Sequence, residues 1–375
     1  MRSKHLISGL AVVGAIALGA ITVSPLGAQQ ASKLRIIQTN FGGDTIHIID
    51  PATNKVVRVL KGFETVHGVI AAPDGSRIYL SSEAENAVTV VDGKTLQVTK
   101  QIPLSGNPNL IDITPDGKTI YAAIALTYDD LSEFPTVKAG PTGGVDVIDT
   151  VSLTKIKTIA MKGGVHDLNV TPDGKFVVVG NSRGGRANVM TVVDTKTNDV
   201  AWTMPMEPAP SPMAVSKKAD GSTDKIYAQN GRDNNFQVID WATRKITQAV
   251  TLPDISGQEK NVFGPPSPSH GLMITPDQKT LVIISRVNSA LYTYSLPDAK
   301  LIGGLPLSGK GAGWLVLTPD GKRAYVANEH TNTVSAVDLA TLKELAVIPV
   351  GFVPSRRKSA RCTKNIGTTV PSAER

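Results

Sequence analysis

The feature that most constrains this chain is a strand-and-turn motif that recurs seven times. In each copy an apolar run ends in aspartate, or once in serine, and is followed by a turn and a second short strand, as in TIHIIDPATNKVV and AVTVVDGKTLQVT. The marker residues are Asp50, Asp92, Asp149, Asp194, Asp240, Ser295 and Asp338. Their spacings are 42, 57, 45, 46, 55 and 43 residues, and the two long ones contain inserts. A period of this length indicates a repeat architecture.

A second motif alternates with the first and consists of two apolar strands joined by a turn that most often reads Pro-Asp-Gly. Proline fixes φ, aspartate hydrogen-bonds its own backbone and glycine tolerates positive φ, so each copy predicts a tight hairpin. The turns centre on Asp74, Asp116, Asp173, Asp220, Asp277 and Asp320. Each unit thus has four short strands without helix periodicity. We expect an all-β, seven-bladed β-propeller of four-stranded antiparallel blades over residues 29–354. Two stacked β-sandwiches would not keep one register along the whole chain.

The two ends of the repeat region do not match each other. The stretch KLRIIQTNFGGDTIHIID supplies strands two to four of a blade but no first strand, so a C-terminal strand should complete it. After AVIPVGFVP, however, the sequence SRRKSARCTKNIGTTVPSAER shows no apolar alternation. We therefore expect closure through residues 350–354 and a basic, disordered tail over residues 355–375.

The last repeat, LTPDGKRAYVANEHTNTVSAVDLATLKELAVIPVG, carries YVAN at positions 325–328. This stretch resembles the YVTN-type β-propeller repeat family, and the resemblance extends over about residues 34–354. It implies the propeller fold. The family is related to seven-bladed lactonase-like propellers and to the propeller subunits of amine dehydrogenases, so the resemblance implies no single activity.

The first 28 residues read as a secretory signal peptide. Arg2 and Lys4 precede the apolar run LISGLAVVGAIALGAITV, and small residues follow, with a cut expected after Ala28. The alternative is an uncleaved membrane anchor, because the run is near spanning length. We expect a periplasmic or secreted protein with no stable membrane insertion after cleavage. Cys362 is the single cysteine, which excludes an intrachain disulfide.

Charge argues against nucleic-acid binding. The formal net charge is +7, but Arg2, Lys4 and the tail from Ser355 carry this excess, which leaves residues 29–354 close to neutral. Binding to phosphate backbones needs a basic face on the folded part. We expect no nucleic-acid partner.

Three histidines share one position of the repeat. His67, His166 and His270 each lie seven residues before a turn aspartate, and the same position elsewhere holds Asn109, Met213 and Gly313. This position starts the first strand of each blade. It lies on what we call the top face, opposite the Pro-Asp-Gly turns. The loops after each second strand return to the top face and supply further candidate ligand-binding residues: Glu83, Arg183, Arg232, Arg286 and His330.

This constellation suits an anionic small molecule or a divalent metal bound by His67, His166 and His270, as histidine triads do in catalytic zinc sites. For the second ring nitrogens, Glu83, Asp167 and Glu329 are candidate acceptors. The bland alternatives are that the histidines pack between blades and that the loop arginines are solvated charges. Because Trp202, Trp241 and Trp314 occupy different repeat positions, we expect them to be blade-packing residues.

No nucleophile elbow, zinc-protease, phosphate-loop or dinucleotide motif occurs, so no catalytic residue is assigned. We expect an exported, monomeric propeller that binds a small ligand or a protein partner at the top face of its central channel. One alternative is a lactonase-like hydrolase, with or without a divalent metal. Another, implied only by the resemblance, is an accessory subunit of a periplasmic dehydrogenase.

Overall fold

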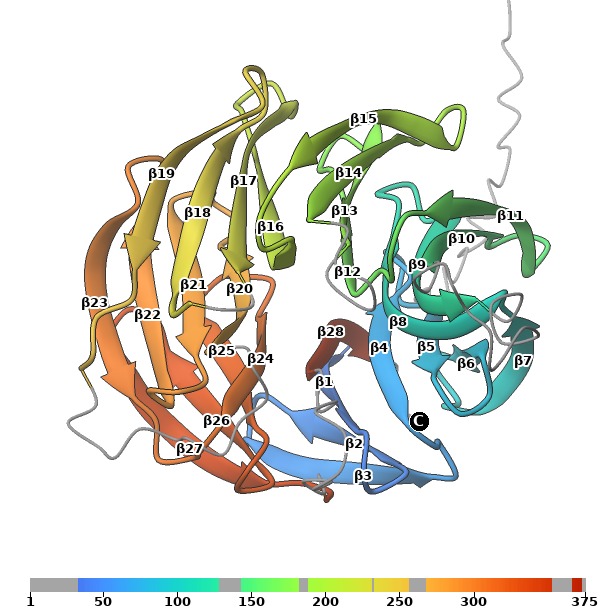
Figure 1. Ribbon diagram of the computed structural model, residues 1–375. Helices are drawn as coiled ribbons and strands as arrows, with labels where there is room; N and C mark the ends of the chain where they lie inside the picture. The colour runs from blue at the N-terminus through green and yellow to red at the C-terminus, as the bar shows by residue number, and fades with distance from the viewer. Residues whose placement is uncertain are drawn as a thin grey trace, which may run out of the picture. The chain divides into compact units, whose positions relative to one another are not determined.

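The computed structural model describes residues 33–127, 143–181, 188–230, 233–255, 268–352 and 366–372. Within these ranges the strands form seven four-stranded antiparallel sheets, which confirms the seven-bladed β-propeller (Figure 1). In the same ranges no helix is long and apolar enough to span a bilayer. The propeller belongs to the unit Ser32–Arg375. The predicted signal peptide lies outside the described residues.

Each blade runs outward from the ring axis in the order of its strands. Blade 1 holds β28 (Ile366–Ser372), β1 (Lys33–Asn40), β2 (Thr45–Asp50) and β3 (Lys55–Lys61). Blade 2 holds β4 (Val66–Ala71), β5 (Arg77–Ser82), β6 (Ala87–Asp92) and β7 (Val98–Pro103). Blade 3 holds β8 (Gly106–Ile113), β9 (Thr119–Thr127), β10 (Gly143–Asp149) and β11 (Thr154–Met161). Blade 4 holds β12 (Asp167–Val170), β13 (Phe176–Gly180), β14 (Val189–Asp194) and β15 (Asp199–Pro205); blade 5 holds β16 (Pro210–Lys217), β17 (Thr223–Asn230), β18 (Asn235–Asp240) and β19 (Lys245–Thr251). Blade 6 holds β20 (Ser269–Ile274), β21 (Thr280–Ser285), β22 (Ala290–Ser295) and β23 (Lys300–Pro306); blade 7 holds β24 (Ala312–Leu317), β25 (Arg323–Asn328), β26 (Thr333–Asp338) and β27 (Lys343–Pro349).

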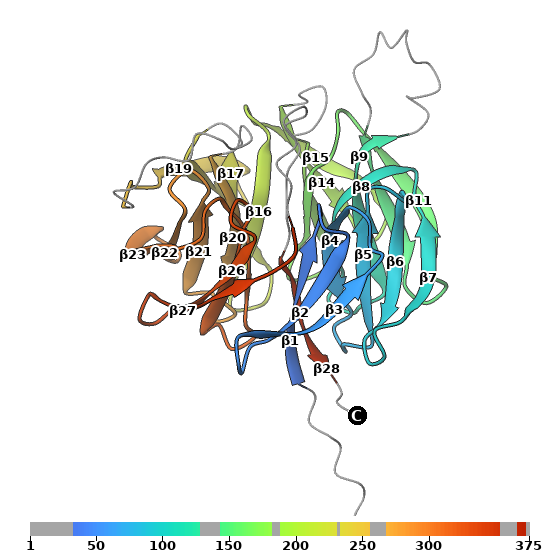
Figure 2. The same ribbon diagram turned by 90° about the horizontal axis from the view of Figure 1, so that it is seen from below.

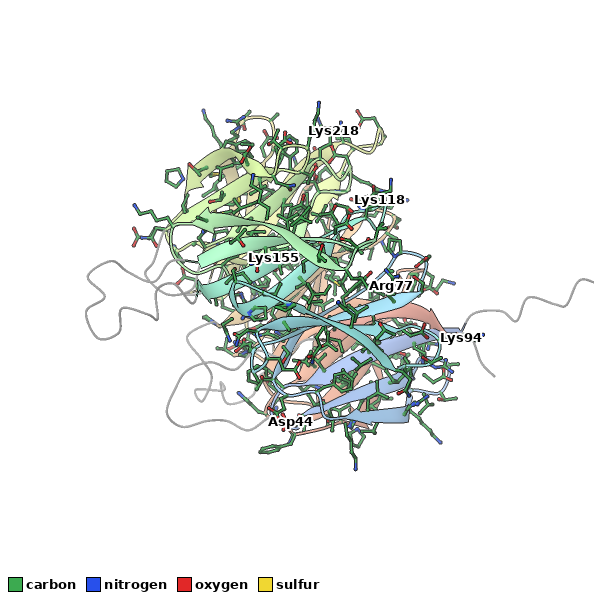
Figure 3. All side chains as sticks on the ribbon, turned by 90° about the vertical axis from the view of Figure 1, so that its right-hand side faces the viewer. Asp44, Arg77, Lys94, Lys118, Lys155 and Lys218 are labelled. Carbon is green, nitrogen blue, oxygen red and sulfur yellow. The ribbon has the colours of Figure 1, made fainter. Side chains whose placement is uncertain are left out.

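The inner hairpins close through side-chain hydrogen bonds at the Pro-Asp-Gly turns. In blade 3 the Thr114 hydroxyl donates to Asp116 Oδ1 at 2.6 Å, and the Lys118 N–H donates to the same oxygen at 3.1 Å. The Thr114 bond holds the pKa of Asp116 below its usual value. Gly117 follows with φ of +72°, which glycine tolerates. Figure 3 shows Arg77 and Lys118, from two of these turns, on the same side of the ring. These turns define the bottom face.

The outer hairpins repeat a second device at the marker aspartates. Asp92 Oδ1 accepts the N–H groups of Lys94 and Thr95 at 3.0 and 2.6 Å, and Leu96 then adopts φ of +60°. Positive φ recurs four residues after every marker, at Asn54, Leu96, Leu153, Asn198, Arg244, Ala299 and Leu342. A left-handed residue that ends a short hairpin loop is a standard way to fix register. The seven copies therefore share one strand pairing.

Apolar side chains fill the spaces between neighbouring blades. Tyr121 and Val147 of blade 3 pack in one buried cluster with Leu168 and Val177 of blade 4. The Tyr121 hydroxyl donates to Asn198 Oδ1 at 2.7 Å, which satisfies its polar end. The innermost strands also contact each other in a closed sequence, β4, β8, β12, β16, β20, β24 and β28, and back to β4. Blade-to-blade packing thus holds the starts of these strands together around the axis.

The C-terminal tail departs from the sequence-based expectation. Residues Ile366–Ser372 form β28, which pairs antiparallel with β1, for example Arg35 with Val370 (Figure 2). It becomes the innermost strand of blade 1 (Figure 1). Disorder over the whole of 355–375 and closure through 350–354 are therefore wrong. The physical reason is that the open edge of β1 gains backbone hydrogen bonds from a partner strand whatever its apolar pattern. Residues 353–365 and 373–375 lie outside the described part.

Candidate functional site

The histidine position lies at irregularities in the innermost strands. Pairing of β4 with β5 shifts between Val66 and Val69, and pairing of β20 with β21 shifts between Ser269 and Leu272. His67 and His270 each fall inside such a shift, and His166 directly precedes β12. Bulges remove a side chain from strand alternation and turn it to a new direction. The regular alternation of side chains along a strand therefore does not decide where the rings of His67 and His270 point.

The three histidines meet although they come from blades 2, 4 and 6. The ring centroids of His67 and His166 are 5.9 Å apart, and those of His166 and His270 are 5.6 Å apart. Both contacts are edge-on, with interplanar angles of 83° and 77°. All three residues are buried, with exposed fractions of 0%, 5% and 3%. We call this group the histidine cluster.

His67 is held by a carboxylate and an amide. Its Nδ1 lies 2.5 Å from Glu83 Oε1, and Asn109 Nδ2 donates to the same oxygen at 3.1 Å. A carboxylate only accepts, so the Nδ1 atom carries a proton that it donates to Glu83 Oε1. Asn109 is fully buried and comes from blade 3. Glu83 and Asn109 therefore fix both the tautomer and the orientation of His67.

His270 is held by a backbone carbonyl of the next blade. Its Nδ1 lies 3.0 Å from Gly313 O, so this nitrogen also carries its proton. Trp314 packs edge-on against His270, with centroids 4.4 Å apart, and stacks on His166 at 6.3 Å. The prediction that Trp314 is a blade-packing residue is wrong, because the pairing of β24 with β25 shifts between Ala312 and Trp314 and the ring lies against two cluster histidines. Trp202 of blade 4 and Trp241 of blade 5 contact each other at 5.4 Å, so these two rings do pack between neighbouring blades.

Blade 7 contributes the buried carboxylate of Glu329 from the loop after β25. Glu329 lies directly on Gly313, since a Cβ added at that glycine would overlap Glu329 Oε1. Arg286 Nη2 of blade 6 pairs with Glu329 Oε1 at 3.2 Å, and both side chains are buried. His330 follows Glu329, and burial lowers its pKa. Glu83, Arg286 and His330 thus follow β5, β21 and β25 at the top ends of their blades, and their ligand-binding role stays a prediction.

Two acids lie on the neighbouring inner strands, Asp167 buried and Asp112 half-buried. Asp112 Oδ2 accepts the Val170 N–H at 2.8 Å, and Asp167 Oδ2 accepts the Met213 N–H at 2.7 Å. Each carboxylate therefore satisfies the open backbone edge of the next blade. Desolvation raises the pKa of Asp112 to about 6 and that of Asp167 to about 7. The prediction that Asp167 accepts from a histidine ring differs from the structure, in which Asp167 Oδ2 accepts from the Met213 N–H and from Asn169 Nδ2.

Two of the predicted ligand-binding residues, Arg183 and Arg232, lie outside the described residues. Across the described ranges, no group of three or more histidine, cysteine or acidic side chains is arranged to hold a metal ion. The metal prediction for His67, His166 and His270 therefore gains no support from this arrangement. Trp314 was not predicted as a site residue. Asn109 was placed at the repeat position that His67, His166 and His270 share, but no role was assigned to it. That shared position was the signal that could have identified Asn109 as part of the site.

The comparisons with known proteins support the fold. No family model matches the chain. The chain is 22% identical over 322 residues to the uncharacterized protein YwhL of Bacillus subtilis, covering 78% of this chain and 67% of that protein. It is 24% identical over 276 residues to the hydrazine synthase subunit beta of Kuenenia stuttgartiensis, covering 68% of this chain and 60% of that one. The chain therefore spans about two thirds or less of these relatives.

Two solved structures resemble the propeller. A chain of Kuenenia stuttgartiensis hydrazine synthase superposes with a TM-score of 0.64 at 21% identity, covering 87% of this chain and all of that one. The dihydro-heme d1 dehydrogenase NirN, in a complex with DHE, superposes with a TM-score of 0.60 at 17% identity, covering 86% and 74%. At these identities the likeness concerns the fold alone. This chain is similar to propeller proteins, and its relation to the YVTN repeat family stays a prediction.

Proposed function

We propose that this chain is an exported β-propeller that binds a small molecule at the histidine cluster on its top face. The observation that carries the proposal is the convergence of His67, His166 and His270 from three separate blades. Burial of polar groups costs free energy, and clusters of buried ionisable groups are concentrated at functional sites. Fixed imidazoles beside an indole ring offer hydrogen bonds and an aromatic surface to one ligand.

Native mass spectrometry tests this proposal. Wild-type protein purified from its own cell envelope should carry a small molecule that is released on denaturation. Substitution His166→Gln should remove it, because it deletes the central ring of the cluster. The matched control is His47→Gln, which changes a histidine on β2 outside the cluster. Protein without a bound molecule, or retention of the molecule by both variants, would contradict the proposal.

A hydrolase is the second candidate, and the contact between Glu83 and His67 favours it. A carboxylate that accepts from Nδ1 leaves Nε2 as a general base, which is the role such pairs have in hydrolytic enzymes. Purified protein should then open simple lactones or esters, and His67→Gln should abolish turnover. Turnover that also falls on addition of a chelator would indicate a metal-dependent reaction. Equal rates in wild type and variant would exclude this role.

A subunit role in a redox complex is the third candidate. Its support is the similarity to a hydrazine synthase subunit and to a dihydro-heme d1 dehydrogenase. Size-exclusion chromatography of envelope extract at low ionic strength tests it. The chain should elute with a larger complex, whereas elution at the size of the monomer would argue for the two ligand-binding candidates.

A further inference from the structure

Blade 7 differs from its neighbours at the position where the histidines stand. It has Gly313 there, and the space that a side chain would fill is occupied by Glu329 from the loop between β25 and β26. A glycine in a strand often marks the close approach of another group. Here that group is a buried carboxylate that rests on the backbone of the innermost strand.

The charge of Glu329 is balanced from the adjacent blade. Arg286 Nη2 contacts Glu329 Oε1 at 3.2 Å, and the side chains are 2% and 0% exposed. The backbone of both loops is also anchored, since the Arg286 N–H donates to Pro268 O and the Glu329 N–H donates to Gly311 O. A buried ion pair adds little net stability, because desolvation offsets the attraction. A gain in stability therefore does not explain why the ion pair of Arg286 and Glu329 lies beside the histidine cluster.

The backbone that Glu329 covers is the one that orients His270. Gly313 O accepts from His270 Nδ1 at 3.0 Å, and Trp314, the next residue, contacts the His270 ring at 4.4 Å. Glu329 thus presses on the residue whose carbonyl fixes the His270 tautomer. A side chain at Gly313 would displace Glu329, and loss of Glu329 would leave the Gly313 backbone uncovered.

We propose that Glu329, held by Arg286, is a positioning residue that fixes the tautomer and direction of His270 through the backbone of Gly313. It acts without touching the bound molecule. This inference deepens the proposed function. The orientation of His270 follows from the contacts alone, and only its role in binding a ligand rests on the proposed function. Gly313 occupies the repeat position of the histidines in blade 7, and the carboxylate of Glu329 leaves no room there for a side chain.

Nitrogen-15 NMR of the histidine rings at one constant pH tests this directly, without any ligand. Wild-type His270 should be in the Nδ1–H form. Glu329→Ala and Gly313→Ala should each reduce the Nδ1–H fraction of His270 at least twofold, as expected when the fixed acceptor moves. Glu329→Gln, which keeps the shape and one acceptor for Arg286, should retain most of it. His67, held by Glu83, should keep its signal in every variant.

The matched control is Asp199→Ala, which breaks the exposed contact between Lys157 Nζ and Asp199 Oδ1 on the outer strands of blades 3 and 4. It should leave His270 unchanged. An Nε2–H tautomer in the wild type would overturn the proposal even if both alanine variants failed to fold. So would an unchanged His270 in both alanine variants. Failure of the ligand test would leave this result standing, because the tautomer is measured in ligand-free protein.

Discussion

Individual residues at the start of the innermost strands decide where the cluster rings point. Gly271 follows His270 with φ of +111°, and its N–H donates to Gln229 Oε1 at 2.7 Å. Few side chains tolerate this conformation, so the sequence His-Gly at this point specifies a bulge as well as a ring. Gly68 also follows a cluster histidine, His67, but without a positive φ, and its N–H donates to the Ser81 hydroxyl at 2.7 Å.

Substitution Gly271→Ala should destabilise the protein and disturb the cluster. The added Cβ would lie 2.9 Å from Ile284 Cδ1 and 3.0 Å from Gly313 O, in addition to the backbone strain. We expect a loss of about 2–3 kcal/mol in the free energy of unfolding. The control Gly62→Ala has φ of +81° in open space and should cost only about 1 kcal/mol. Chemical denaturation measures both, and equal losses would contradict the crowding at Gly271.

Asp167 should make stability depend on pH. Burial raises its pKa from 3.8 to about 7, so between about pH 4 and pH 7 the folded state binds more protons than the unfolded state. Stability should therefore fall as pH rises through this window and level off above it. Asp167→Asn keeps an acceptor for the Met213 N–H and removes the charge. At pH 8 it should be more stable than wild type by on the order of 2 kcal/mol. Parallel pH profiles of the two proteins would contradict this assignment.

At the scale of elements, β28 is what converts a row of blades into a ring. It pairs with β1 and contacts β4 and β24, so it lies between the blades that carry His67 and Trp314. In the other six blades the innermost strand continues through a hairpin into the second strand of the same blade. Blade 1 alone among the described sheets takes its innermost strand from the far end of the chain.

Removal of residues 366–375 should therefore lower the melting temperature strongly. It deletes a whole strand and its ladder of backbone bonds to β1. At about 1 kcal/mol per bond this corresponds to a fall of roughly 10 °C or more for a domain of this size. The control truncation removes only residues 373–375 and should have little effect. Differential scanning calorimetry would decide, and equal melting temperatures would show that β28 does not close the ring.

The sequence predicted the elements well because each repeat carries its own turn chemistry. The aspartates of Thr-Pro-Asp-Gly-Lys and of the marker turns act locally, so their role is readable residue by residue. Trp314 was misjudged because a pairing shift in β24 changes which side chains face the axis, and such shifts depend on the partner strand. The tail was misjudged because its pairing relies on backbone groups, which every sequence possesses.

For the molecule as a whole, the sevenfold arrangement explains how distant residues form one site. The histidines are separated by about a hundred residues of chain, yet each begins an innermost strand and each innermost strand contacts the next. A position repeated in every blade is thereby converted into a set of side chains around one axis. Variation at that position, from His67 to Asn109 to Gly313, then sets the chemistry of the top face.

The most direct test of this account is a nuclear Overhauser experiment on histidine-labelled protein in a deuterated background. The ring protons of His166 should give cross-peaks to those of both His67 and His270, because the centroids lie 5.9 and 5.6 Å apart. His47 on β2 should give none to the cluster and is the internal control. Absence of both His166 cross-peaks, with contacts to blade-packing residues such as Leu168 in their place, would show that the rings lie between blades and that no histidine cluster exists.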